Sequence, residues 1–120
     1  MAVDLPVAIV TGAANGIGRA VADLLSVRGY AVAAFDREPR DSPYFGRTVD
    51  VADEASVRAG IGAVLHRFGR IDALVNNAGI MVRKPVEALT LAEWNRVLST
   101  NLTGAFLCAR EAAPALRRAR

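Results

Sequence analysis

The segment Val7–Gly18 constrains the fold more strongly than any other part of this 120-residue chain. A short apolar run from Val7 to Thr11 enters a turn that contains three glycines. A strand that leads through such a turn into a helix is typical of a phosphate-binding site, because the first N–H groups of the helix have no backbone partner. The segment therefore predicts a strand, a phosphate cradle and a helix.

Each glycine of this turn has its own physical task. Gly12 permits the sharp turn, Gly16 lets the backbone approach a pyrophosphate, and Gly18 lets the helix pack closely on the strand. Arg19 follows Gly18, where a Walker-type loop would carry lysine and then serine or threonine. The pattern therefore favours dinucleotide binding. The candidate cradle consists of Thr11, Gly12, Asn15, Gly16, Ile17 and Gly18.

Apolar periodicity divides the chain into alternating strands and helices. We expect strands at 7–11, 31–35, 48–50 and 71–75, with a loop at 37–47. The first helix carries the stripe Ile17, Val21, Leu24 and Leu25, and a second helix runs from an Asp53 cap to Gly69. This order predicts one α/β domain over residues 1–120. It is a Rossmann-type, doubly wound parallel sheet, truncated to its first four strands in the order 3-2-1-4.

The last helix is expected to begin at a capping box, Thr90 to Glu93. Pro114 is expected to kink or end it. Asn101 lies among the apolar residues that we expect to be buried, and a buried amide requires a specific hydrogen-bond partner. That expected buried stripe consists of Trp94, Val97, Leu98, Leu102, Ala105, Phe106 and Ala109.

Composition excludes several classes of function. The net charge of +3 comes entirely from the arginine-rich end, residues 110–120, so the remainder is neutral and nucleic acid is not an expected partner. No apolar run approaches the roughly 20 residues of a membrane span, and no signal peptide is visible, so we expect a cytoplasmic protein. Cys108 and His66 are single residues of their kind, which argues against a metal site.

Asp36 follows the second expected strand, 24 residues after Gly12. A carboxylate there accepts hydrogen bonds from the ribose hydroxyls of an adenosine and repels a 2′-phosphate, which predicts NAD rather than NADP. Asn15 agrees, since a basic residue is expected in the turn where a 2′-phosphate is bound. Arg37 leaves two alternatives open: it pairs with a 2′-phosphate, or it stacks on adenine.

Four motifs in this order resemble the N-terminal half of a short-chain dehydrogenase/reductase. They are Thr11-Gly12-x-x-x-Gly16-x-Gly18, Asp50-Val51, Asn76-Asn77-Ala78-Gly79 and Asn101-Leu102-Thr103-Gly104. The resemblance covers essentially the whole chain. It implies that Asp50 binds the adenine amino group beside the Val51 backbone. It also implies that Asn77, Ala78 and Gly79 line the adenosine ribose.

The resemblance also assigns Asn101 to the catalytic Asn-Ser-Tyr-Lys tetrad, where the asparagine kinks a helix and orders a water in the proton relay. The alternative for Asn101 is a helix-interior amide that bonds a neighbouring loop. The family's catalytic base, a tyrosine four residues before a lysine, has no match here. Lys84 is the only lysine, and neither Tyr30 nor Tyr44 has that spacing.

Two functions remain from the sequence. The first is an NAD-dependent oxidoreductase that interconverts a small-molecule alcohol and a ketone, of which this chain is the N-terminal portion. By the same resemblance, the full-length protein is a homo-oligomer, and residues 1–120 alone are expected to be inactive and poorly stable. The second is a non-catalytic NAD-binding module or pseudoenzyme.

Overall fold

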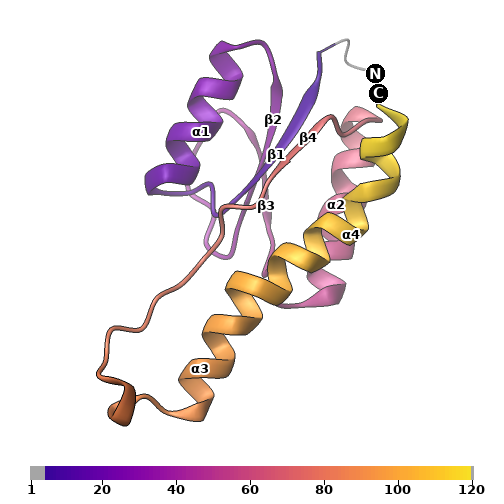
Figure 1. The fold of residues 1–120 in the computed structure, drawn as a ribbon. Coiled ribbons are helices and arrows are strands. Elements are labelled where there is room, and N and C mark those ends of the chain that lie inside the picture. Colours follow the sequence, from indigo (N-terminus) through magenta and orange to yellow (C-terminus); the bar gives the residue numbers. More distant parts are fainter. Residues whose placement is uncertain (1–4, 120) are drawn as a thin grey trace.

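A computed structural model describes residues 5–119 of the chain. Strands and helices alternate through most of it, as the sequence predicts (Figure 1). In order they are β1 (Val7–Thr11), α1 (Gly16–Val27), β2 (Ala31–Asp36), β3 (Phe45–Thr48), α2 (Glu54–Phe68), β4 (Ala73–Val75), a 3-10 turn (Val86–Ala88), α3 (Leu91–Leu98), a π-helical segment (Ser99–Thr103) and α4 (Gly104–Arg118).

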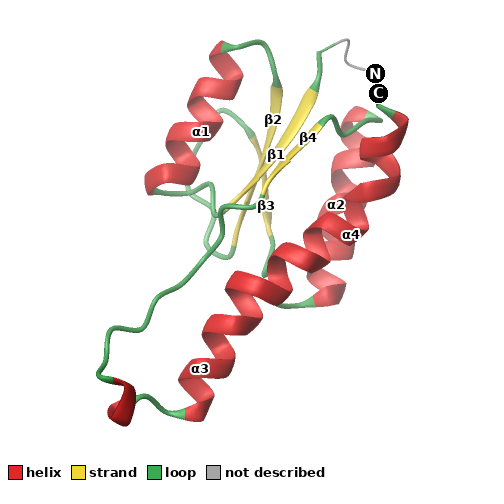
Figure 2. Ribbon diagram, viewed as in Figure 1, coloured by secondary structure: helices red, strands yellow, loops and turns green. Residues whose placement is uncertain are grey.

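The four strands form one parallel sheet in the order β3-β2-β1-β4, which confirms the expected topology. Helix α1 covers one face of the sheet, and α2 and α4 lie together on the other (Figure 2). Strand β1 is central, and all five of its residues are buried. The fold is therefore a three-layer Rossmann arrangement around an apolar strand.

Two hydrophobic clusters occupy the two faces of the sheet. Phe35, Val57 and Leu107 belong to the larger cluster, which joins the sheet to α2 and α4. Val10 and Ala22 belong to the smaller one beneath α1. Because successive side chains of a strand point to opposite faces, β1 contributes to both clusters and holds the layers together.

The predicted helix caps are present. Oδ1 of Asp53 accepts hydrogen bonds from the N–H groups of Ala55 and Ser56, and Gly69 ends α2 in the left-handed conformation. Thr90 and Glu93 form the reciprocal capping box at the start of α3. Caps of this kind satisfy backbone groups that a helix end leaves unpaired, so they depend on local sequence and could be predicted from it.

Three strands differ from expectation: β2 is one residue longer and includes Asp36, and β3 and β4 begin at other residues. Strand β3 is formed by Phe45–Thr48 instead of residues 48–50, because it aligns with the second half of β2 from Ala33 onward. Strand β4 begins at Ala73 instead of residue 71, since the Asp72 carboxylate accepts the Val7 N–H at 2.8 Å in place of a strand partner. The differences in β3 and β4 come from pairing between strands.

The stripe expected on α1 is only partly buried. Ile17 is 76% exposed and Leu24 is 53% exposed, whereas Gly18 and Ala22 face the sheet. The glycine turn sets the angle at which α1 leaves β1, and close packing at Gly18 brings the small side chains inward. Apolar periodicity therefore predicted the position of this helix correctly, but the face that it predicted to be buried is only partly the one that packs on the sheet.

The last predicted helix is divided into α3, the π-helical segment and α4. The stripe expected to be buried is largely exposed at Trp94, Leu98, Leu102 and Phe106, and Asn101 is exposed with it. Helix α4 continues through Pro114 to Arg118, so this proline does not end it. The residues that α4 buries are Gly104, Leu107, Cys108, Ala112 and Ala115.

Candidate functional site

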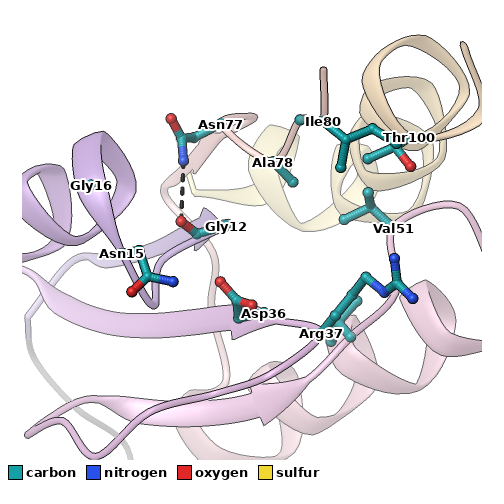
Figure 3. A pocket seen from close by; sticks show the side chains of 12 residues that line it. Gly12, Asn15, Gly16, Asp36, Arg37, Val51, Asn77, Ala78, Ile80 and Thr100 are labelled. Carbon is teal, nitrogen blue, oxygen red and sulfur yellow. Dashed lines mark hydrogen bonds between the residues drawn. The ribbon is translucent and has the colours of Figure 1, made fainter. Parts of the chain in front are cut away.

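A pocket of about 340 Å³ lies at the carboxyl ends of the strands, where Figure 3 shows the glycine turn facing Asp36 and Asn77. This edge of a parallel sheet is the usual ligand-binding edge of open α/β folds. Helix α3 and the loop before it extend beyond the same edge (Figure 1). The lining residues are Gly12, Asn15, Gly16, Asp36, Arg37, Val49, Val51, Asn77, Ala78, Gly79, Ile80 and Thr100.

The glycines of the turn are required by geometry. Gly12 and Gly16 have φ values of 65° and 54°, in the region that glycine tolerates best. A Cβ at Gly18 would lie 2.1 Å from the Gly12 carbonyl oxygen, so α1 can approach β1 only without a side chain there. A Cβ at Gly16 would meet no atom within 4 Å, which leaves this backbone open toward the pocket.

Thr11 and Asn77 join the ends of β1 and β4. The Thr11 hydroxyl oxygen accepts the N–H groups of Asn77 and Ala78 at 3.0 and 2.9 Å. In return, Nδ2 of Asn77 donates to the carbonyl oxygens of Thr11 and Gly12 at 3.1 and 3.2 Å. These two side chains therefore support the turn from behind, and Thr11 itself does not line the pocket.

Asp36 connects the glycine turn to the loop after β2. One carboxylate oxygen accepts the Ala14 N–H and the other accepts the Glu38 N–H, each at 3.0 Å. Each oxygen keeps a further lone-pair site, so the side chain can still accept ribose hydroxyls. The carboxylate is thus fixed in direction before a ligand arrives.

The wall opposite the glycine turn is built around Val51. Its side chain lies close to Gly104, where a Cβ would be 2.6 Å from Cγ2 of Val51. Oδ1 of the neighbouring Asp50 accepts a hydrogen bond from the Ala52 N–H at 3.0 Å. Asp50 does not line the pocket. Absence of a side chain at Gly104 therefore lets α4 approach the residues expected to surround adenine.

Asn101 has the specific partner that its amide requires, although its position is exposed. Both groups of its amide bond the Ile80 backbone, in the loop that follows β4. Its backbone lies within the π-helical segment, and single-turn π segments are frequent at functional sites. This geometry matches the loop-bonding alternative and leaves the catalytic role as a prediction.

Most of the predicted cofactor residues come together in one pocket. Thr11, Ile17, Gly18 and Asp50 do not line it; Thr11 and Gly18 shape the turn from behind. Three lining residues were missed, namely Val49, Ile80 and Thr100. Thr100 directly precedes Asn101, and this position was its only signal in the sequence; the structure shows that Thr100 is buried.

The pocket fits an adenine dinucleotide. Backbone N–H groups of a helix N-terminus attract a pyrophosphate, and the open side at Gly16 leaves space for it. Asp36 is the last residue of β2, and an acidic residue after the glycine turn is the usual partner of the ribose hydroxyls in Rossmann folds. Within residues 5–119 no cluster of three potential metal ligands occurs, and no helix is long and apolar enough to cross a membrane.

Comparisons with known proteins agree with this geometry. The sequence profile of the short chain dehydrogenase family matches residues 6–120. D-threitol dehydrogenase of Mycolicibacterium smegmatis is 42% identical over 87% of this chain and 45% of its own length. Cis-4-hydroxycyclohexanecarboxylate dehydrogenase of Sinomonas cyclohexanicum is 44% identical, over 88% of this chain and 47% of its own length. The chain thus spans about half the length of the curated relatives it matches.

Solved structures give the same result. Ligand-free aldohexose dehydrogenase of Thermoplasma acidophilum superposes with a TM-score of 0.92 at 35% identity, over 96% of this chain and 46% of that one. A 3-ketoacyl-(acyl-carrier-protein) reductase of Brucella melitensis, in complex with NADH, superposes with a TM-score of 0.90 at 30% identity. The match covers 94% of this chain and 51% of that one. The chain therefore belongs to the short-chain dehydrogenase family, whose members are oxidoreductases that bind NAD(P).

Proposed function

We propose that residues 1–120 are the N-terminal part of a single dinucleotide-binding domain in an NAD-dependent oxidoreductase. The reaction is interconversion of a small-molecule alcohol and a ketone. The observation that carries the choice of NAD is the Asp36 carboxylate, which faces the pocket at the end of β2. Its negative charge favours two ribose hydroxyls over a 2′-phosphate.

The chain's own residues bind and orient the cofactor. The turn at Gly12 and Gly16 receives the pyrophosphate, Asp36 receives the adenosine ribose, and Val51 forms the adenine wall. When bound, the nicotinamide ring supplies hydride-transfer chemistry. Arg37, at the rim, stacks on adenine in this proposal, because the adjacent carboxylate disfavours a phosphate.

Asn101 holds the loop after β4 through the Ile80 backbone and contributes to proton transfer by resemblance to the family tetrad. Hydride transfer to a carbonyl also needs a group that donates a proton to the oxygen. A Tyr-x-x-x-Lys pair does not occur in this sequence. We place that pair elsewhere in the whole protein, so that residues 1–120 alone bind the cofactor without turnover.

The substrate class rests on the names of the relatives. D-threitol is an open-chain polyol, and cis-4-hydroxycyclohexanecarboxylate carries a ring hydroxyl. Both offer a secondary alcohol, which is oxidised to a ketone. We therefore propose a secondary alcohol of a small, polar molecule as the substrate of the whole protein.

The test of this function is a titration of the whole protein with NADH and NADPH. Wild type is expected to bind NADH about tenfold more tightly than NADPH, or better, because the Asp36 carboxylate repels the 2′-phosphate. Asp36→Asn removes the negative charge with little change of shape. It should therefore weaken NADH binding and reduce the ratio between the affinities for NADH and NADPH. Asp41→Asn, an exposed carboxylate in the loop that follows β2, is the matched control and should leave both affinities unchanged. A preference for NADPH in wild type would overturn the assignment.

Activity separates the two functions that the sequence left open. Oxidation of secondary alcohols by the whole protein, followed by the absorbance of NADH, supports the enzyme. Binding of NADH with no turnover across a panel of polyols and cyclic alcohols supports the non-catalytic module instead.

We also propose that the whole protein is a cytoplasmic homo-oligomer. The support is the apolar stripe that runs from α3 through the π-helical segment into α4, where Trp94, Leu102 and Phe106 are each more than half exposed. An exposed stripe of this kind is favourable only when another surface covers it. Light scattering after size exclusion should give a dimer or larger, and a monomer would contradict the proposal.

A further inference from the structure

The loop from Arg37 to Tyr44 joins β2 to β3 without a helix. Arg37, at its start, lines the nucleotide pocket, and Tyr44 directly precedes β3. Two hydrogen bonds from backbone N–H groups to side chains shape the loop: Glu38 N–H donates to Oδ1 of Asp36, and Tyr44 N–H donates to Oγ of Ser42. Both join neighbours in the sequence, so neither fixes the loop to the helix beside it.

The Tyr44 side chain reaches across to α1. Its hydroxyl donates a hydrogen bond to Oδ1 of Asp23, and Nε of Arg19 donates to the same oxygen at 3.1 Å. The Arg19 guanidinium carbon also lies 5.7 Å from the centroid of the Tyr44 ring, within cation–π range. We name Arg19, Asp23 and Tyr44 the clasp.

Charge strengthens the clasp. The hydrogen bond from Tyr44, followed by that from Arg19, holds the pKa of the Asp23 carboxyl below its usual value. Burial and the bond to Asp23 raise the pKa of the Tyr44 hydroxyl. At neutral pH the acceptor is therefore ionised and the donor protonated, which makes this a charge-assisted hydrogen bond.

The clasp connects the two sides of the nucleotide pocket. Arg19 lies in the first turn of α1, and its N–H donates to the carbonyl oxygen of Asn15, a lining residue, at 3.2 Å. Arg19 and Asp36 also line a second, smaller hollow together with Arg40 and Ser42 of the loop. Through Tyr44, the loop that carries Arg37 is held against the helix that carries the phosphate cradle.

We propose that Tyr44 is a positioning residue for the adenosine half of the cofactor; this inference rests on the proposed function. Tyr44 does not line the pocket and acts by fastening the loop to α1. A loop that is already held loses little conformational entropy when the ligand binds. A loose loop has to be ordered at that step, which weakens binding.

The test is calorimetric titration of the whole protein with ADP-ribose, which contains the adenosine half and lacks nicotinamide. Tyr44→Phe removes only the hydroxyl and should weaken ADP-ribose binding about fivefold, because the released loop then has to be ordered when the ligand binds. Tyr30→Phe is the matched control. Within the described residues its hydroxyl has no hydrogen-bond partner, so the affinity should not change.

Two further variants show whether the hydrogen bond itself is responsible. Asp23→Asn keeps an oxygen that accepts the Tyr44 hydroxyl, whereas Asp23→Ala does not. Asp23→Asn should therefore bind ADP-ribose more tightly than Asp23→Ala. In steady-state assays, Tyr44→Phe should raise KM for NAD and leave kcat unchanged, a split that a general loss of stability does not produce.

The outcomes separate this inference from the proposed function. If wild type does not bind ADP-ribose, the proposed function fails. If wild type binds and Tyr44→Phe binds equally tightly, the positioning role is overturned while the proposed function stands. Equal weakening by Tyr44→Phe and Tyr30→Phe would also overturn it, because the effect would then be a general one.

Discussion

Asn101 and Ile80 are joined by a reciprocal pair of hydrogen bonds. Oδ1 of Asn101 accepts the Ile80 N–H at 2.8 Å, and Nδ2 donates to the Ile80 carbonyl oxygen at 2.9 Å. The side chain thus acts as a strand partner for one residue of the loop after β4. Gly79 leaves room for it, since a Cβ there would lie 3.3 Å from Oδ1.

Asn101→Asp is expected to break one half of this pair. The new carboxylate faces the Ile80 carbonyl oxygen without a proton to donate, and at this exposed position the loss should be about 1 kcal/mol of unfolding free energy at neutral pH. Asn95→Asp, on the exposed side of α3, is the control and should change stability by less than about 0.5 kcal/mol. Urea denaturation measures both, and equal effects would show that the Ile80 bonds contribute nothing.

Gly18→Ala is expected to disrupt the glycine turn. The added methyl group would lie 2.1 Å from the Gly12 carbonyl oxygen. Because the clash is with a backbone atom, it can be relieved only if the backbone moves. We expect a loss of about 3 kcal/mol or more, together with loss of NADH binding. Gly62→Ala in α2 meets no atom within 4 Å and should instead stabilise by about 0.5–1 kcal/mol. Thermal melting of both variants tests the contrast.

Glu93 is expected to make the protein sensitive to acid. The hydrogen bond from Lys84, followed by that from the Thr90 backbone, lowers the pKa of Glu93 from 4.5 to about 2. A lowered carboxyl pKa stabilises the fold above the unfolded-state value, and this contribution is lost as the pH falls from about 4.5 to about 2.

Glu93→Gln keeps the capping box and removes the titrating group, so it should flatten the decline in stability over that interval. Glu87→Gln, an exposed neighbour, is the control and should retain the slope of wild type. Urea denaturation at successive pH values measures the slope. An unchanged slope in Glu93→Gln would contradict the prediction.

Cys108 is expected to be unreactive in the native protein. Burial raises the pKa of its thiol to about 11, so at pH 8 about one thiol in a thousand is ionised. Labelling with a thiol reagent, followed by peptide mapping, should modify Cys108 only after denaturation. Rapid labelling under native conditions would show that α4 separates from the sheet.

Sequence alone predicted the parts of the fold that depend on neighbouring residues. Strand β1 has the bounds expected for it, and both the Asp53 cap and the Thr90–Glu93 capping box are present. Each of these features is decided within a few residues by backbone conformation, apolar content or a side chain that bonds its own helix end.

The candidate site was predicted where its residues lie in motifs and missed where they do not. Asp36 and Asn77 line the pocket, and their roles in cofactor binding stay predictions. Ile80 and Thr100 were missed because they reach the pocket only through the Asn101 bonds and the π-helical segment. Neither feature leaves a periodic signal, since both depend on contact between segments about 20 residues apart.

The sequence by itself determined the strand order, the glycine turn and the carboxylate at the end of β2. Tertiary structure decided which faces of the helices are buried and which residues hold the glycine turn in place. The stripe containing Trp94 and Phe106 has the spacing of a buried face, yet α4 buries Leu107 and Cys108 instead. The physical reason is that apolar spacing indicates only that a helix has an apolar face. Whether that face packs on this sheet depends on contacts between segments that are distant in the sequence.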